Sequence, residues 1–283
     1  MGTKKGEEHM LENTTNIEEL NYEQVEELAK KESMLLRKDY STALFRLLED
    51  FIINKFDVKY RVRFAIKNFP GTNQQLLAQS IIDSNNAEAN YTYALKVNGA
   101  DTKKHGQVIV DSKDVLLNLM YATNVKGADV NAHAKVILES GETFAIYQVA
   151  QLPGIEDVRI YGDAILNSDA PKYNYYFARD VKGADIEKHQ KVVENLGDIG
   201  TMCEFALKVP FANVESLQEK IVNSGHLFYN YLLALESVGL DITPNMEVVK
   251  SYIGRDPKAQ DYYDKLQSKL AGTLPIDAIH QLL

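Results

Sequence analysis

Apolar residues recur along this chain in alternating short stripes, each with the 3.6-residue spacing of a helix that buries one face. Within a window of 28 residues, the first stripe falls at positions 5, 8, 9, 12 and 15. The second stripe falls at positions 20, 23 or 24, and 27, and glycines separate the stripes. The pattern therefore predicts two short helices per window, joined by tight turns, and an all-α protein.

The same window repeats through most of the chain. The string VNGAD at 97–101 returns as VKGAD at 125–129 and at 181–185, at offsets of 28 and 56 residues. A hairpin of this length cannot bury both faces of its helices alone, so neighbouring repeats must stack. The predicted repeats, whose residues we number from 1 to 28, are 55–82 (with a one-residue slip), 83–110, 111–138, 139–166, 167–194, 195–222 and 223–250.

Three columns define the helices of the repeat. Position 12 is a small residue that lets a neighbouring helix approach, and position 19 follows a glycine turn as the N-cap of the second helix. Position 27 is a branched apolar residue that faces the core. The columns hold Ala94, Ala122, Ala150, Ala178, Ala206 and Ala234; Asp101, Asp129, Asp157, Asp185, Asn213 and Asp241; and Ile109, Ile137, Ile165, Val193, Ile221 and Val249.

The segments that flank the array are predicted to be caps. Residues 19–54 are expected to form N-terminal capping helices and residues 251–283 C-terminal capping helices, because a stacked array needs polar outer faces. Residues 1–18 are polar and are expected to be a disordered tail or an expression leader. The predicted fold is a right-handed α-solenoid of about seven two-helix repeats, capped at both ends.

This architecture resembles the α-solenoid class of HEAT-like and armadillo-like helical-hairpin repeats over residues 55–250. The 28-residue period is shorter than the ~40–47 residues of those repeats. None of their residue signatures appears in this sequence. The resemblance therefore implies the stacked architecture, and no functional residue is carried over from it.

Charge and cysteine content restrict the function only slightly. The formal net charge of −9 is concentrated in residues 1–27, which hold eight glutamates against two lysines, so the rest of the chain is close to neutral. This balance neither favours nor excludes nucleic acid. A single cysteine rules out an intrachain disulfide and favours a reducing cytoplasm. No apolar run approaches the ~18 residues needed to span a bilayer, so no membrane partner is expected.

Position 23 of the repeat holds a ladder of polar aromatic residues. Such a ladder can stack on or hydrogen-bond a repeating ligand, as helical repeats do with single-stranded RNA. Position 23 also lies on the apolar stripe of the second helix. The alternative is therefore that these residues pack in the core, with one ring nitrogen of each histidine hydrogen-bonded, and contact no ligand. Packed helices lie ~8–10 Å apart and no carboxylate column joins the ladder, so neither a metal site nor a cofactor is expected. The ladder comprises His105, His133, Tyr161 and His189.

Polar positions 21, 22 and 25 of the second helices form another candidate surface. It is basic toward the N-terminal half and acidic toward the C-terminal end, and the segment at 55–67 adds further cations. It is either an electrostatic guide for an acidic partner, the acidic segment at 7–27 included, or an ordinary solvated face. The candidates are Lys59, Arg61, Arg63, Lys103, Lys104, Gln107, Lys135, Arg159, Lys188 and Lys191.

Tyrosine is abundant on the first helices, mostly on the packing stripe. Tyr173 and Tyr176 lie off that stripe and are the better candidates for partner contact. Cys203 falls in a core column, which predicts an inert buried thiol. The sequence contains no glycine-rich phosphate loop, no HExxH motif and no nucleophile elbow, and N-capping accounts for the aspartate column. We therefore expect no catalytic residue.

These observations favour a non-enzymatic helical-repeat protein that binds a protein or peptide as an adaptor, inhibitor or regulator. The alternative is a nucleic-acid-binding α-solenoid that uses the basic N-terminal half. An enzyme on this scaffold is the least favoured reading, although helical-repeat folds do host catalysis.

Overall fold

The computed structural model describes residues 17–34 and 38–273, and in these ranges every regular element is helical. The chain divides into two compact units, here the N-terminal unit (Met1–Ile137) and the C-terminal unit (Leu138–Leu283). Helices pack in consecutive pairs, which confirms the predicted helical solenoid. Most of the predicted tail at 1–18 and the last ten residues of the predicted C-terminal cap lie outside the described ranges.

The N-terminal unit begins with a 3₁₀ turn, Ile17–Glu19, and continues with eight α-helices within the described ranges. The last helix of the set ends in the C-terminal unit. The helices are α2 (Tyr22–Met34), α3 (Lys38–Lys55), α4 (Val58–Lys67), α5 (Gln74–Asp83), α6 (Ala87–Lys96), α7 (Thr102–Ser112), α8 (Val115–Asn124) and α9 (Val130–Ser140).

The C-terminal unit continues the alternation of first and second helices. Its helices are α10 (Thr143–Ala150), α11 (Val158–Leu166), α12 (Pro171–Asp180), α13 (Ile186–Leu196), α14 (Ile199–Lys208), α15 (Val214–Asn223), α16 (Leu227–Glu236), α17 (Thr243–Ser251) and α18 (Ala259–Leu270).

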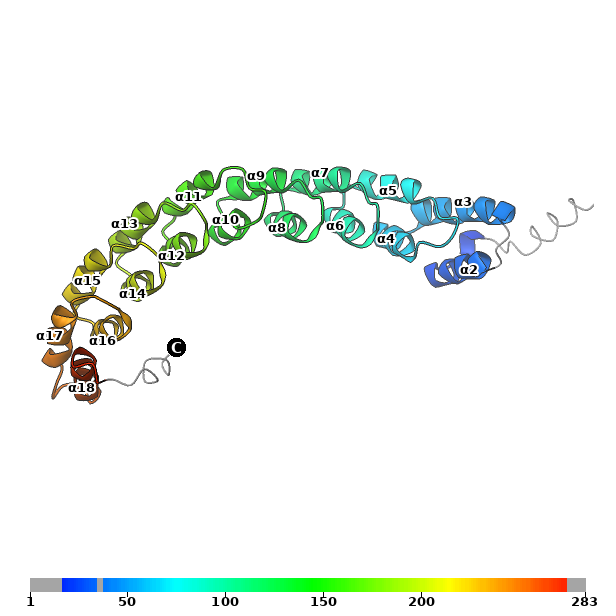
Figure 1. Cartoon of the computed structure of the whole chain (residues 1–283). Coiled ribbons are helices and arrows are strands. Elements are labelled where there is room, and N and C mark those ends of the chain that lie inside the picture. The colour runs from blue at the N-terminus through cyan, green and yellow to red at the C-terminus, as the bar shows by residue number, and fades with distance from the viewer. Residues whose placement is uncertain (1–16, 35–37, 274–283) are drawn as a thin grey trace, which may run out of the picture. The chain divides into compact units, whose positions relative to one another are not determined.

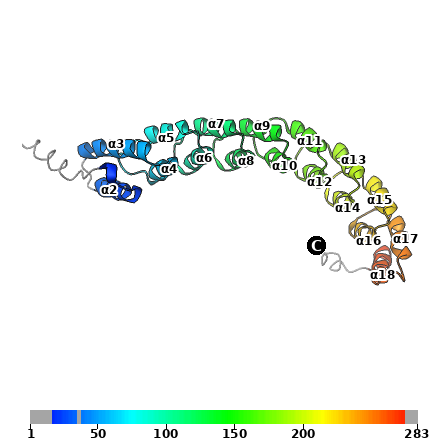
Figure 2. The same ribbon diagram turned by 180° about the vertical axis from the view of Figure 1, so that it is seen from behind.

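In each unit the helices form two rows, a first-helix layer of even-numbered helices and a second-helix layer of odd-numbered helices (Figure 1). Neighbours within a row also pack, as α4 does on α6 and α12 on α14. In the C-terminal unit the rows bend, and α10, α12, α14 and α16 lie on the inner side of the bend (Figures 1 and 2). The first-helix layer therefore lines the concave side of this unit.

The columns read from the sequence have the predicted structural roles. All six residues at position 27 are fully buried between the two layers. The position-19 side chains cap the second helices, as where Asp101 accepts a hydrogen bond from the backbone N–H of Lys104 at 3.1 Å. The preceding glycines, such as Gly127 with φ +84°, take the left-handed conformation that ends the first helix.

Polar side chains close both ends of the described array. In α2, Glu26 pairs with Arg63 at 2.8 Å and with Lys67 at 3.2 Å, both on α4. In α18, the Lys269 ammonium donates to the carbonyl oxygens of Ala234 and Leu235, at 2.7 and 2.8 Å, at the C-terminus of α16. A cation at that end of a helix satisfies its last carbonyls and opposes its dipole.

Candidate functional site

The histidine ladder lies in the core, between the two layers. His105, His133 and His189 are at most 1% exposed. The Nδ1 atom of each histidine lies 2.7–2.8 Å from the Oδ1 atom of a buried asparagine fifteen residues earlier. The asparagine belongs to the first helix of the same repeat, so each pair joins the two helices of a hairpin. The pairs are Asn90–His105, Asn118–His133 and Asn174–His189.

The asparagine fixes the tautomer of its histidine. The Asn118 amide nitrogen donates to the carbonyl oxygens of Ile109 at 3.0 Å and of Asp114 at 2.8 Å. Its Oδ1 atom is therefore left to accept, and Nδ1 of His133 must carry the proton. Burial lowers the pKa of all three histidines to about 4, against an opposing pull from a nearby aspartate. The imidazoles are therefore neutral at physiological pH.

We call each of these asparagine–histidine hydrogen bonds a joint. The joints show that the predicted apolar stripe is wrong at position 8. Position 8 was expected to be apolar, but it is a buried asparagine in four repeats. The signal that reveals the pair is that positions 8 and 23 change together. Asparagine accompanies histidine three times, and the other combinations are Ile146 with Tyr161, Met202 with Leu217, and Asn230 with Asn245.

The ladder residues therefore do not form a surface. Aromatic rings of the first helices cover the imidazoles, with centroid separations of 4.5 Å for Tyr93–His105 and 4.7 Å for Tyr121–His133. Tyr161 is also buried. A ligand could reach these rings only if the helices separated, so the structure favours packing over ligand contact.

The cations of the second-helix layer are exposed, and most are paired with carboxylates of their own helix or its cap. Lys104 lies 3.6 Å from Asp101, Lys188 lies 3.0 Å from Asp185, and Lys191 lies 2.6 Å from Glu187. Arg159 contacts both carboxylate oxygens of Asp157, and Gln107 donates to Asp111. Lys103 and Lys135 are exposed on the same layer. This pairing is typical of a solvated face, and such exposed pairs contribute little to stability.

The basic segment of α4 is largely engaged within the N-terminal unit. Arg63 is paired with Glu26 of α2. Arg61 donates to the carbonyl oxygen of Ser80 at 3.0 Å, and the Lys59 ammonium lies 5.1 Å from the centre of the Tyr60 ring. Part of the acidic N-terminal segment thus meets this basic segment within one unit.

A cluster of partly exposed aromatic rings lies in the first-helix layer of the C-terminal unit. We call it the aromatic patch; it consists of Tyr147 on α10 with Tyr173, Tyr175, Tyr176, Arg179 and Asp180 on α12. Ring centroids lie 6.2 Å apart for Tyr147–Tyr173 and 5.8 Å apart for Tyr147–Tyr176. Tyr175 is buried, and the other three tyrosines are half-buried.

Arg179 holds the aromatic patch together. Its guanidinium lies 4.9 and 5.1 Å from the centres of the Tyr175 and Tyr176 rings. Nε and Nη2 donate to the two carboxylate oxygens of Asp180 at 2.6 and 2.7 Å. The Tyr147 hydroxyl donates to the same carboxylate at 2.6 Å across neighbouring repeats. The Arg179 guanidinium lowers the pKa of Asp180, which favours the ionised pair.

Sequence reasoning found two members of the patch and missed the others. Tyr173 and Tyr176 were selected because they lie off the packing stripe. Tyr147 falls on that stripe but remains half-buried, and the Arg179–Asp180 pair left no signal in the 28-residue columns. A contact between Tyr147 and Asp180, 33 residues apart, becomes visible only when the repeats are stacked.

Other potential chemistry is limited in the described residues. The Cys203 thiol is fully buried, and burial raises its pKa to about 12, as in an inert core cysteine. Within residues 17–34 and 38–273, no three metal-ligating side chains converge on a common point. None of the described helices has the length and apolar composition required to cross a bilayer.

Paired helices stacked in two layers define this chain as a helical-repeat protein of the α-solenoid type. Comparison with models of protein families, with curated proteins and with solved structures finds no match in any of the three.

Proposed function

We propose that this chain is a non-enzymatic HEAT-like or armadillo-like repeat protein of the cytoplasm, which binds a protein or peptide through the aromatic patch. It would act as an adaptor, an inhibitor or a regulator. The observation that supports the proposal is the set of half-buried tyrosines held by Arg179 on α10 and α12, two helices that lie on the inner side of the bend of the C-terminal unit.

The chemistry of the patch suits a protein partner. Tyrosine and arginine are enriched at the energetic centres of protein interfaces, because they bury a large area while keeping polar groups available. Tyr173 and Tyr176 are half-buried, so part of each side chain is open to a partner. The ring contacts and the Arg179–Asp180 pair order the patch beforehand, which lowers the entropic cost of association.

The nucleic-acid alternative has weaker support. Binding to phosphates requires available cations, whereas Arg179 already contacts Asp180 through two nitrogens and most candidate cations of the second-helix layer are paired. A salt titration separates the two functions. Nucleic-acid affinity should fall log-linearly with salt, whereas binding to an aromatic patch should change little.

The direct test is a comparative pull-down from lysate with nuclease treatment. The bait is the full chain, Tyr173→Ala with Tyr176→Ala, or the matched control Lys188→Ala with Lys191→Ala from the same repeat. We expect a stoichiometric protein that survives nuclease, is retained by the control and is lost with the tyrosine variant. Equal recovery by all three baits, or loss only with the lysine variant, would contradict the proposal.

A further inference from the structure

Phe211 breaks the pattern of the loops that join first and second helices. It stands at position 17, where glycine appears in four other repeats as Gly99, Gly127, Gly183 and Gly239. Its φ of +63° lies in the left-handed region, which is strained for a bulky residue. Its side chain is 95% exposed, so contacts within the chain do not offset this strain.

The next loop carries a second exposed apolar side chain. Val238 is 98% exposed and stands at position 16, where other repeats have Asn98, Lys126 and Lys182. We call Phe211 and Val238 the loop tips. They lie on consecutive repeats, whose helices pack at a separation of about 8–10 Å. They are the most exposed of the large apolar side chains that the structure describes, and the backbone outlier at Phe211 motivates a search for a functional role.

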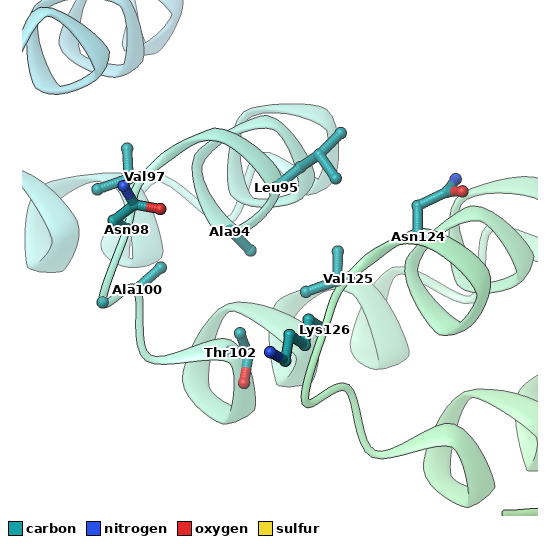
Figure 3. A pocket seen from close by; sticks show the side chains of 10 residues that line it. Ala94, Leu95, Val97, Asn98, Ala100, Thr102, Asn124, Val125 and Lys126 are labelled. Carbon is teal, nitrogen blue, oxygen red and sulfur yellow. The ribbon is translucent and has the colours of Figure 1, made fainter.

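Loops of the N-terminal unit border two cavities. Two cavities, of about 290 and 500 Å³, lie on either side of the loop at 97–100, and we call them the loop pockets. Ala94, Ala100 and Val125 border the smaller one (Figure 3). Tyr93, Val97 and Ile82 border the larger one. The two pockets are neighbours, because both are bordered by this loop.

The charges around the two loop regions are opposite. Segments 96–104 and 126–129, around the loop pockets, carry four lysines against two aspartates. Segments 208–215 and 236–241, around the loop tips, carry one lysine against three carboxylates. Complementary potentials steer association and select its register.

We propose that the loop tips of one copy insert into the loop pockets of a second copy, so that the chain self-associates. The two neighbouring pockets offer one place for each of the two tips. Because the contact joins two different surfaces, a copy that gives its tips to one neighbour can still offer its pockets to another. Longer assemblies should therefore form as concentration rises.

The first test is sedimentation velocity of the full chain across a wide concentration range. Phe211→Gly should weaken self-association at least tenfold and raise the melting temperature, because glycine relieves the strained backbone. Leu116→Lys is the matched control, since it removes an exposed apolar side chain on α8 that lies outside the loops. The control should associate as the wild type does.

The second test is complementation. Ala100→Leu should fill the loop pockets while leaving the tips intact, so this variant alone should not associate. Mixing it with Phe211→Gly, which keeps intact pockets, should restore a heterodimer. A monomeric wild type, undiminished association of Phe211→Gly, or failure of the mixture to pair would overturn the proposal. Phe211-dependent binding to neutral phospholipid vesicles or to another protein, with the wild type monomeric, would identify a different occupant.

Discussion

The second helices carry two polar columns that look alike in sequence but have opposite roles. Position 23 is buried, and its histidines are neutral and bonded to asparagines of the first helix. Positions 21, 22 and 25, which we together call the exposed column, are mostly exposed, and their charges pair locally, as in Lys191 with Glu187. The buried column should therefore determine stability, whereas the exposed column should be replaceable. Partner contact is left to the other layer.

The largest expected effect is on the pH dependence of unfolding. The folded pKa of about 4 lies below the ordinary 6.5 of histidine, so the folded state binds fewer protons than the unfolded state. The stability is complete above about pH 6.5 and is lost as the pH falls toward 4. At pH 5 each histidine should cost about 2 kcal/mol. Denaturant unfolding at pH 7 and pH 5 measures this loss, and equal stabilities would contradict the neutral buried ladder.

The next effect comes from breaking one joint. Asn118→Ala leaves His133 Nδ1 and the Ile109 carbonyl without their partner and should destabilise the fold by about 2–4 kcal/mol. The combination of Ile146 with Tyr161, which occupies positions 8 and 23 in another repeat, suggests a double variant that should restore stability. Asn118→Ile with His133→Tyr should recover most of the stability and reduce the pH dependence by about one histidine's share. Failure of the double variant to exceed Asn118→Ala would contradict the paired exchange.

A third variant tests the register of the layers without changing polarity. Ala150 is buried in the alanine column of α10, a helix that packs against α11 and α12. Ala150→Leu should overpack this contact and cost about 1–3 kcal/mol. Thermal unfolding measures the change, with Leu116→Lys as a surface control. An unchanged melting temperature would contradict the stacking register.

The smallest effect should come from the exposed column. Lys188→Ala with Lys191→Ala removes two ion pairs of solvent-exposed side chains. The free energy of unfolding should change by less than about 0.5 kcal/mol, because exposed pairs gain little over hydrated charges. A loss comparable to that of Asn118→Ala would remove the distinction between the two columns.

Much of the fold could be predicted because its signals are local. The period, the alanine column and the aspartate caps all act within one repeat, where spacing alone places a side chain on a face or at a turn. The Asp101 cap needs only the backbone of Lys104, three residues on. Position 8 was assigned wrongly because a buried asparagine fits a helical stripe as well as an apolar residue does. Its partner His133 lies on the other helix of the hairpin.

The repeat, the helix pairs and their caps could be predicted from the order of residues alone, because these features depend on hydrogen bonds and burial within 28 residues. The stacking of the repeats was needed to show which layer lines the concave side of the C-terminal unit, and that Arg179, Asp180 and Tyr147 form one patch. The structure also shows that Phe211, whose backbone is strained, leaves its side chain almost fully exposed. These properties depend on contacts between successive repeats, which the spacing of residues within one repeat does not specify.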